Sequence, residues 1–234
     1  MKVQVDDIVM YYEEYGSGAP LLCLHGNGGS HKSFYPVIDE LEKHFRCILP
    51  DSRWQGKTTK GTQSLTYPLL SQDMLGFLQA IGVNEPVSIV GYSDGGIMAL
   101  ECARNNPQID RVVTLGANWD TTGTTPEFEA WAQKTLRRAE KWSFFSCCRR
   151  KAELIKLMLE EDRYPDYKGL REVHCPVLLM VGDADVIPYD HTLWMKDELP
   201  NARISIVSDC GHSIMRTRPD VFIDTAISFL TQND

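Results

Sequence analysis

Short apolar runs, separated by segments of a different periodicity, recur along the chain of 234 residues. Short runs of mainly apolar side chains are typical of strands buried on both faces of a parallel sheet. Six runs fit this description, at residues 21–24, 47–49, 87–90, 112–115, 177–181 and 204–207. Two earlier segments, residues 3–5 and 8–14, predict an antiparallel pair of strands ahead of them.

Helical spacing of apolar residues marks the segments between these runs. The spacing is clearest at residues 69–81, 95–105, 191–198 and 219–230. Parallel strands need such crossover helices to connect them. The chain is 43% hydrophobic, and its length is sufficient for one large core. The pattern therefore predicts the α/β fold class, with a mainly parallel, doubly wound sheet in a single structural domain.

One stretch, from residue 118 to about residue 167, shows no strand pattern. Aromatic residues lie among helix formers there: Trp119, Phe128, Trp131, Trp142, Phe144 and Phe145. We expect a helical cap or lid at 118–167, inserted between a first part of the core at 1–117 and a second part at 168–234. Because open α/β sheets bind ligands at the carboxyl ends of their strands, such a cap would roof the site. The alternative is that its aromatic side chains only pack the insertion against the body.

The net charge of −8 is spread over the chain without a block of five like charges, so it bears on solubility more than on a particular partner. We expect no nucleic-acid partner. No apolar run reaches the roughly 18 residues of a spanning helix, and the first residues lack the apolar segment of a signal peptide. These features predict a cytoplasmic protein without a membrane partner, present as a monomer or homodimer.

The seven cysteines are odd in number and scattered, which is not typical of a disulfide framework in a chain of this length. No cluster of cysteine and histidine has the spacing of a metal site, so we expect no metal ligand. The adjacent pair Cys147 and Cys148 is assigned no role.

The strongest chemical signal is the pentapeptide Gly-Tyr-Ser-Asp-Gly at residues 91–95. It joins the predicted strand at 87–90 to the predicted helix at 95–105, and Gly-x-Ser-x-Gly at a strand-to-helix turn is typical of a nucleophile elbow. Small residues two before and two after the serine let strand and helix approach closely. The helix that follows points its amino end at the site, where its unpaired N–H groups favour negative charge. These features predict Ser93 as the nucleophile.

A serine hydroxyl needs a base to remove its proton, and the base needs a third group to hold its tautomer. His212 lies on the loop between the predicted strand at 204–207 and the last predicted helix, so we predict it as the general base. The loop after the predicted strand at 177–181 offers two acids, Asp183 and Asp185.

With nucleophile, acid and histidine in this order, the chain resembles the α/β-hydrolase family, and the matching motifs span nearly all of it. In the acid loop of the family, Gly-x-x-Asp is followed shortly by Pro. This pattern places the acid on Asp185 and leaves Asp183 as a turn residue that caps its own loop.

The resemblance also implies an oxyanion hole. Residues 25–27, His-Gly-Asn, match the His-Gly-x segment of the family. There the residue after His-Gly and the residue after the nucleophile donate backbone N–H groups to the oxyanion, which implies Asn27 and Asp94 as donors. His25 is then a structural residue that ties the loop down.

Two further matches concern the substrate. Residues 51–56 resemble the family's Asp-x-Arg-Gly-x-Gly turn, with Trp54 in place of a glycine, either at the rim of the site or in a surface turn. Trp54 and Trp119 are candidate substrate contacts. The elbow resembles that of the biphenyl-hydrolase-like (valacyclovir hydrolase) proteins and related bacterial esterases. In the former, an Asp after the nucleophile helps to recognise the α-amino group of the substrate. This resemblance implies a substrate contact for Asp94 if its carboxylate faces the pocket, and no contact if it faces solvent or its own loop.

Together these motifs imply a serine hydrolase that cleaves a small to medium carboxylic ester, without a cofactor, through an acyl-enzyme. Amino-acid esters are included if Asp94 faces the pocket. The same triad serves carbon–carbon bond hydrolases, thioesterases and cofactor-free haloperoxidases, because the fold does not set the substrate. The alternative outside the enzymes is a ligand-binding receptor on a hydrolase scaffold.

Overall fold

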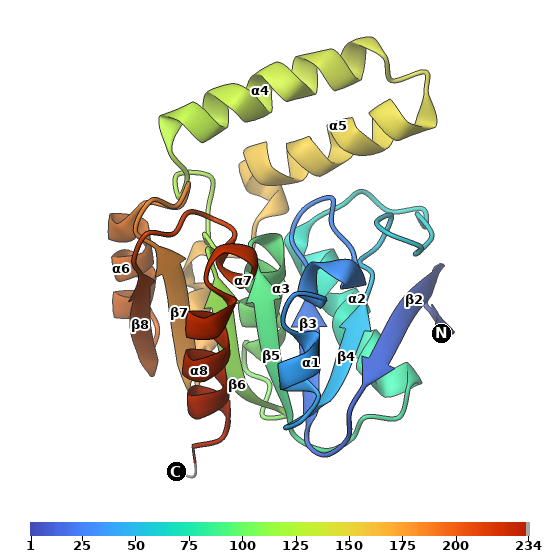
Figure 1. The fold of residues 1–234 in the computed structure, drawn as a ribbon. Helices are drawn as coiled ribbons and strands as arrows, with labels where there is room; N and C mark the ends of the chain where they lie inside the picture. The colour runs from blue at the N-terminus through green and yellow to red at the C-terminus, as the bar shows by residue number, and fades with distance from the viewer. Residues whose placement is uncertain (233–234) are drawn as a thin grey trace.

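The computed structural model describes residues 1–232 and contains, within that range, one sheet of eight strands in the order β1-β2-β4-β3-β5-β6-β7-β8 (Figure 1). The strands are β1 (Lys2–Val5), β2 (Ile8–Tyr15), β3 (Pro20–Leu24), β4 (Arg46–Pro50), β5 (Val87–Tyr92), β6 (Ile109–Leu115), β7 (Val177–Gly182) and β8 (Ala202–Val207). Pairs β1/β2 and β2/β4 are antiparallel, and the other pairs are parallel. The predicted α/β class with a mainly parallel sheet is confirmed.

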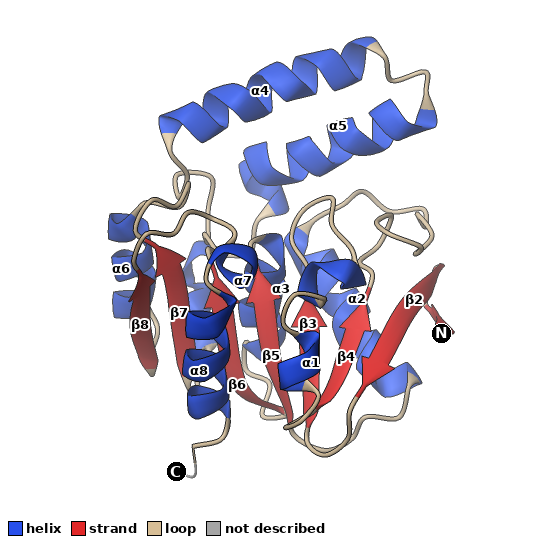
Figure 2. Ribbon diagram, viewed as in Figure 1, coloured by secondary structure: helices blue, strands red, loops and turns tan. Residues whose placement is uncertain are grey.

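Helices cover both faces of this sheet (Figure 2). They are η1 (His31–Phe34), α1 (Ile38–Leu41), α2 (Tyr67–Ala80), α3 (Asp94–Ala103), α4 (Pro126–Lys141), α5 (Ser146–Leu159), η2 (Glu161–Arg163), η3 (Tyr167–Glu172), α6 (Tyr189–Glu198), α7 (Ile214–Thr217) and α8 (Pro219–Leu230). Helices α2 and α3 lie on one face, and α1 and α8 lie on the other. Among residues 1–232, no helix is long and apolar enough to cross a membrane.

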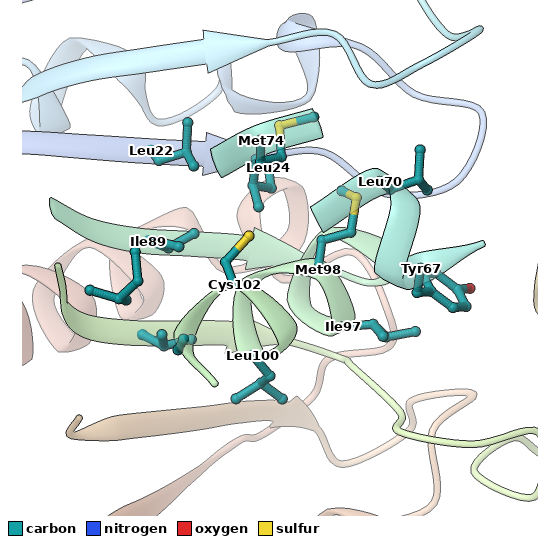
Figure 3. Close-up of a cluster of buried hydrophobic side chains, with 14 of the residues drawn as sticks. Leu22, Leu24, Tyr67, Leu70, Met74, Ile89, Ile97, Met98, Leu100 and Cys102 are labelled. Atoms are coloured by element: carbon teal, nitrogen blue, oxygen red, sulfur yellow. The ribbon is translucent and has the colours of Figure 1, made fainter. Parts of the chain in front are cut away.

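The two faces form two hydrophobic cores, because strands that alternate about a buried sheet send neighbouring side chains to opposite sides. On one side, Leu22 and Leu24 of β3 contact the core formed by α2 and α3, where Met74 and Met98 are buried (Figure 3). On the other side, Cys23 packs in the core that α1 and α8 complete. This packing holds the carboxyl end of β5 rigidly at the centre of the sheet.

One predicted strand is less buried than expected. Residues 204–207 were expected to be buried on both faces, but Ile204 of β8 is only partly buried and Ile206 is 50% exposed. The expectation is wrong because β8 is the last strand of the sheet and pairs only with β7. An apolar run indicates a hydrophobic segment, but it does not indicate whether the strand lies at the edge of the sheet.

Helices α4 and α5 form a hairpin above the carboxyl ends of the parallel strands (Figures 1 and 2). The described chain has no strand between β6 and β7. Helix α4 begins after Thr125, whose hydroxyl accepts a hydrogen bond from the N–H of Phe128, with Pro126 at its first position. The division of the chain at residues 118 and 167 stays a prediction, but the hairpin lies where a cap would roof the site.

Candidate active site

Ser93 lies at the turn between β5 and α3, with φ 54° and ψ −120°. A serine rarely adopts this region, so the surrounding packing must hold it there. A Cβ added to Gly95 would lie 2.2 Å from the carbonyl oxygen of Leu24, and one added to Gly91 would lie 2.2 Å from the carbonyl oxygen of Gly95. The two glycines of the motif are therefore required by close backbone contacts, and the elbow exposes the serine hydroxyl at the end of the strand.

Three side chains that are far apart in the sequence form a chain of hydrogen bonds at this point. His212 Nε2 lies 3.0 Å from Ser93 Oγ, and His212 Nδ1 lies 2.7 Å from Asp185 Oδ1. A carboxylate can only accept, so Nδ1 carries the proton and Nε2 is free to accept the serine proton. The side chain of Asp185 is fully buried, and its Oδ1 also accepts the N–H of Ile187 at 3.1 Å. This arrangement suits a nucleophile, its base and the acid that orients the base.

Gly116, which follows β6, is a site residue that the sequence patterns missed. Its φ is +58°, and a Cβ at this position would lie 2.8 Å from both Asp185 Oδ2 and His212 Nδ1. Only glycine leaves room for Asp185 and His212 to meet. The available signal was a glycine directly after a buried strand, and this signal does not reveal that the acid and histidine loops converge there.

Asp183 has a different role from the one expected. Its carboxylate was expected to cap its own loop, but Oδ2 accepts the N–H of Asp209 at 2.9 Å and Oδ1 accepts the N–H of Cys210 at 3.0 Å. These hydrogen bonds lower the pKa of Asp183. The expectation was wrong because the partners lie 26 and 27 residues away in the sequence. Asp183 thus joins the acid loop to the loop that carries His212.

The loop after β3 lies against the nucleophile. A Cβ on Gly26 would lie 3.0 Å from Ser93 Cβ. The ring of His25 is buried, its Nε2 accepts the N–H of Ser52 at 3.0 Å, and its Nδ1 donates to the carbonyl of Gly26 at 2.8 Å. Burial lowers the pKa of His25, so the ring is neutral and can accept as well as donate. His25 therefore ties this loop to the loop after β4, next to the two residues predicted as oxyanion donors.

The side chains of those two residues meet. Asn27 Nδ2 donates to Asp94 Oδ2 at 2.8 Å and to the carbonyl of Leu154 in α5 at 2.8 Å. Asp94 is 5% exposed. Burial raises its pKa to about 6, although the hydrogen bond from Asn27 acts in the opposite direction. One amide side chain therefore links the oxyanion loop, the nucleophile elbow and the cap hairpin.

A cavity of about 210 Å³ opens on Ser93 and His212. Ser93 and His212 lie at its floor, and the cap hairpin contributes Phe128, Trp131 and Ile155. A second cavity of about 400 Å³ adjoins it, since both share Asn27, Trp131 and Ile155. The cap therefore presents mainly apolar side chains to whatever binds at Ser93.

The two candidate tryptophans lie elsewhere. Among the described residues that line these two cavities, neither Trp54 nor Trp119 is present. Trp119 is fully buried and its indole N–H donates to the carbonyl of Asp166 at 3.2 Å. Trp54 has φ +60°, the left-handed conformation that the usual glycine of this turn adopts easily, and Lys60 Nζ lies 4.4 Å from its ring centre. Their contact with substrate stays a prediction.

Comparison with known proteins identifies the architecture. A family model described as alpha/beta hydrolase fold matches residues 19–146. The serine hydrolase BPHL of Homo sapiens is 25% identical, over 98% of this chain and 85% of its own. The 2-hydroxy-6-oxo-6-(2'-aminophenyl)hexa-2,4-dienoic acid hydrolase of Metapseudomonas resinovorans is 25% identical, over 94% of this chain and 87% of its own. The esterase EaEST of Exiguobacterium antarcticum has a TM-score of 0.83 at 19% identity, over 99% of each chain. The resemblance expected from the elbow is confirmed.

Proposed function

Because the chain belongs to the α/β-hydrolase fold family and is a serine hydrolase, we propose that it cleaves a small to medium carboxylic ester through an acyl-enzyme on Ser93. The observation that carries this proposal is the continuous hydrogen-bond chain from Ser93 Oγ through His212 to Asp185 at the floor of an apolar cavity. A hydroxyl that lies 3.0 Å from a properly oriented imidazole can lose its proton as it attacks.

In the proposed reaction, Ser93 Oγ attacks the ester carbonyl while His212 Nε2 takes the hydroxyl proton. Asp185 stabilises the imidazolium that forms. The tetrahedral oxyanion accepts hydrogen bonds from the backbone N–H groups of Asn27 and Asp94, and such donors contribute on the order of 3 kcal/mol each. His212 then protonates the leaving alcohol. A water molecule, activated by the same imidazole, releases the acid from the acyl-enzyme.

The surroundings of Asp94 favour simple acyl esters over amino-acid esters. An amine contact would need a carboxylate that faces the bound substrate, because a buried cation requires a counter-charge. The carboxylate of Asp94 is instead 5% exposed and accepts a hydrogen bond from Asn27. The apolar side chains of Phe128, Trp131 and Ile155 suit an uncharged acyl group.

Carbon–carbon bond hydrolysis is the second candidate, because a relative named as a dienoic acid hydrolase is 25% identical over almost the whole chain. The two reactions share the triad and differ in the bond that breaks after the tetrahedral stage. A receptor without turnover is disfavoured, because His212 makes both hydrogen bonds that a catalytic base needs, one to Ser93 and one to Asp185.

The decisive experiment compares the native protein with Ser93→Ala. We expect the native protein to hydrolyse p-nitrophenyl acetate and to react covalently with a fluorophosphonate probe, and the variant to do neither. Ser33→Ala is the matched control, since Ser33 lines the same cavity and has no hydrogen bond to a histidine among the described residues. The probe should still label this control. Undiminished turnover by Ser93→Ala would refute the assignment.

A substrate panel then separates the candidate reactions. It contains simple acyl esters, aminoacyl esters, thioesters and a dienoate with a scissile carbon–carbon bond. We expect the highest kcat/KM on simple acyl esters, and the same order of preference in Asp94→Asn. A loss confined to aminoacyl esters in Asp94→Asn would instead identify Asp94 as the amine contact.

A further inference from the structure

The outer end of the cap hairpin exposes a cluster of aromatic side chains. Trp142, Phe144 and Phe145, in the turn between α4 and α5, are 50%, 69% and 52% exposed. Their rings contact one another, with centroids 5.7 Å apart for Trp142 and Phe144 and 4.2 Å apart for Phe144 and Phe145. Figure 1 shows this turn at the end of the hairpin, away from the sheet. A contiguous exposed apolar cluster of this kind marks an interaction site.

The segment around the turn is strongly basic in a protein whose net charge is −8. Residues 131–151, which we name the cap tip, contain seven exposed cations: Lys134, Arg137, Arg138, Lys141, Arg149, Arg150 and Lys151. Its one acidic residue, Glu140, lies 3.2 Å from Lys156. None of the seven cations forms an ion pair with another of residues 1–232. The cap tip therefore joins an exposed aromatic cluster to uncompensated positive charge.

We propose that the cap tip docks on the surface of a membrane that contains anionic lipids. Tryptophan is favoured at the level of the lipid headgroups and phenylalanine in the adjacent acyl region. Lysine and arginine beside them are attracted to anionic headgroups. A second copy of the chain fits less well, because a symmetric contact through the same patch would bring the cations of both copies together.

This docking is peripheral, and it differs from one sequence-based expectation. The expectation of no membrane partner rested on the absence of a spanning run, which does not bear on a surface-bound tip. The tip also adjoins the proposed site, since Trp131, Cys147, Arg150 and Lys151 line the second cavity. If the proposed function holds, docking brings the entrance near Ser93 next to esters dissolved in the lipid.

The test is co-sedimentation of the full chain with vesicles of phosphatidylcholine alone or of phosphatidylcholine and phosphatidylglycerol in equal parts. We expect binding to the anionic vesicles and a loss of binding at high salt, because screening weakens the attraction. The triple variant Lys141→Gln/Arg149→Gln/Arg150→Gln should bind on the order of a hundredfold more weakly, since each cation contributes about fivefold at such a surface. The variant Trp142→Ser/Phe144→Ser/Phe145→Ser should bind the anionic vesicles about tenfold more weakly for each aromatic ring removed, because that ring no longer transfers from water into the membrane surface.

The matched control is Lys2→Gln/Lys32→Gln/Lys168→Gln, which removes three exposed cations outside the cap tip and should bind as the native protein does. Circular dichroism melting verifies that every variant is folded. Ser93→Ala should also bind normally, so that a failure of the proposed catalysis and a failure of docking give different results. Equal binding by the tip variants and the control would overturn the proposal. Absence of binding to anionic vesicles would also overturn it. This holds even if the tip instead binds a second copy of the chain or an acidic polypeptide such as polyglutamate.

Discussion

Replacing Gly116 with alanine should separate the geometry of the triad from the stability of the fold. The added Cβ would lie 2.8 Å from Asp185 Oδ2 and 2.8 Å from His212 Nδ1, whereas ordinary contact begins near 3.4 Å. Restoring that contact moves the acid and the base by roughly 0.6 Å, and displacements of about 1 Å can cost a hundredfold in rate. We therefore expect kcat on p-nitrophenyl acetate to fall by about ten- to a hundredfold, with a smaller change in KM.

The substitution also has a conformational cost, because alanine at φ +58° is strained by about 1 kcal/mol. Gly82→Ala is the matched control for this cost. Gly82 has φ +76°, and a Cβ there would meet nothing within 4 Å. Both variants should lose similar stability in urea unfolding, and only Gly116→Ala should lose activity. Full activity in Gly116→Ala, or an equal loss in Gly82→Ala, would refute the argument that contact with the triad is what matters.

Three further changes test neighbouring contacts. Asp185→Asn should lower kcat by about four orders of magnitude while the melting temperature changes little, because the amide favours the wrong tautomer of His212. Burial raises the pKa of Asp94 to about 6, so the folded state binds this proton more tightly than the unfolded chain, and stability is lost as pH rises through 6. Asp94→Asn does not lose this stability. Its free energy of unfolding in urea, relative to that of the native protein, should therefore increase by up to about 3 kcal/mol between pH 4 and pH 7. A difference that does not change with pH would contradict this. Asn27→Ala should cost about 1–3 kcal/mol, because Asp94 Oδ2 and the carbonyl of Leu154 lose their donor; the exposed Asn84→Ala should cost much less.

The strands of the sheet could be predicted from the sequence because their signal is local. A run such as Val-Ser-Ile-Val at residues 87–90 must leave water, and its length, with Pro86 before it and Gly91 after it, favours a buried strand. The elbow is local in part, since the close contact of Gly91 is with Gly95, at the start of the helix that follows Ser93, whereas the close contact of Gly95 is with Leu24 of β3. The partial exposure of β8 could not be predicted, because the position of a strand at the edge or the centre of a sheet depends on which strands pair.

The sequence alone thus indicated which residues we propose to carry the chemistry, in the order Ser93, Asp185 and His212, because motif and chain order reflect local turns and the connections of a parallel sheet. The contacts that surround these three residues depend on the tertiary structure. It brought Gly116 against the acid and the base, placed Asp183 on the loop of His212, and turned the carboxylate of Asp94 toward Asn27. It also left the aromatic turn of the cap in solvent. Each of these depends on contacts between segments far apart in the chain, and such contacts form only when the sheet and the hairpin pack together.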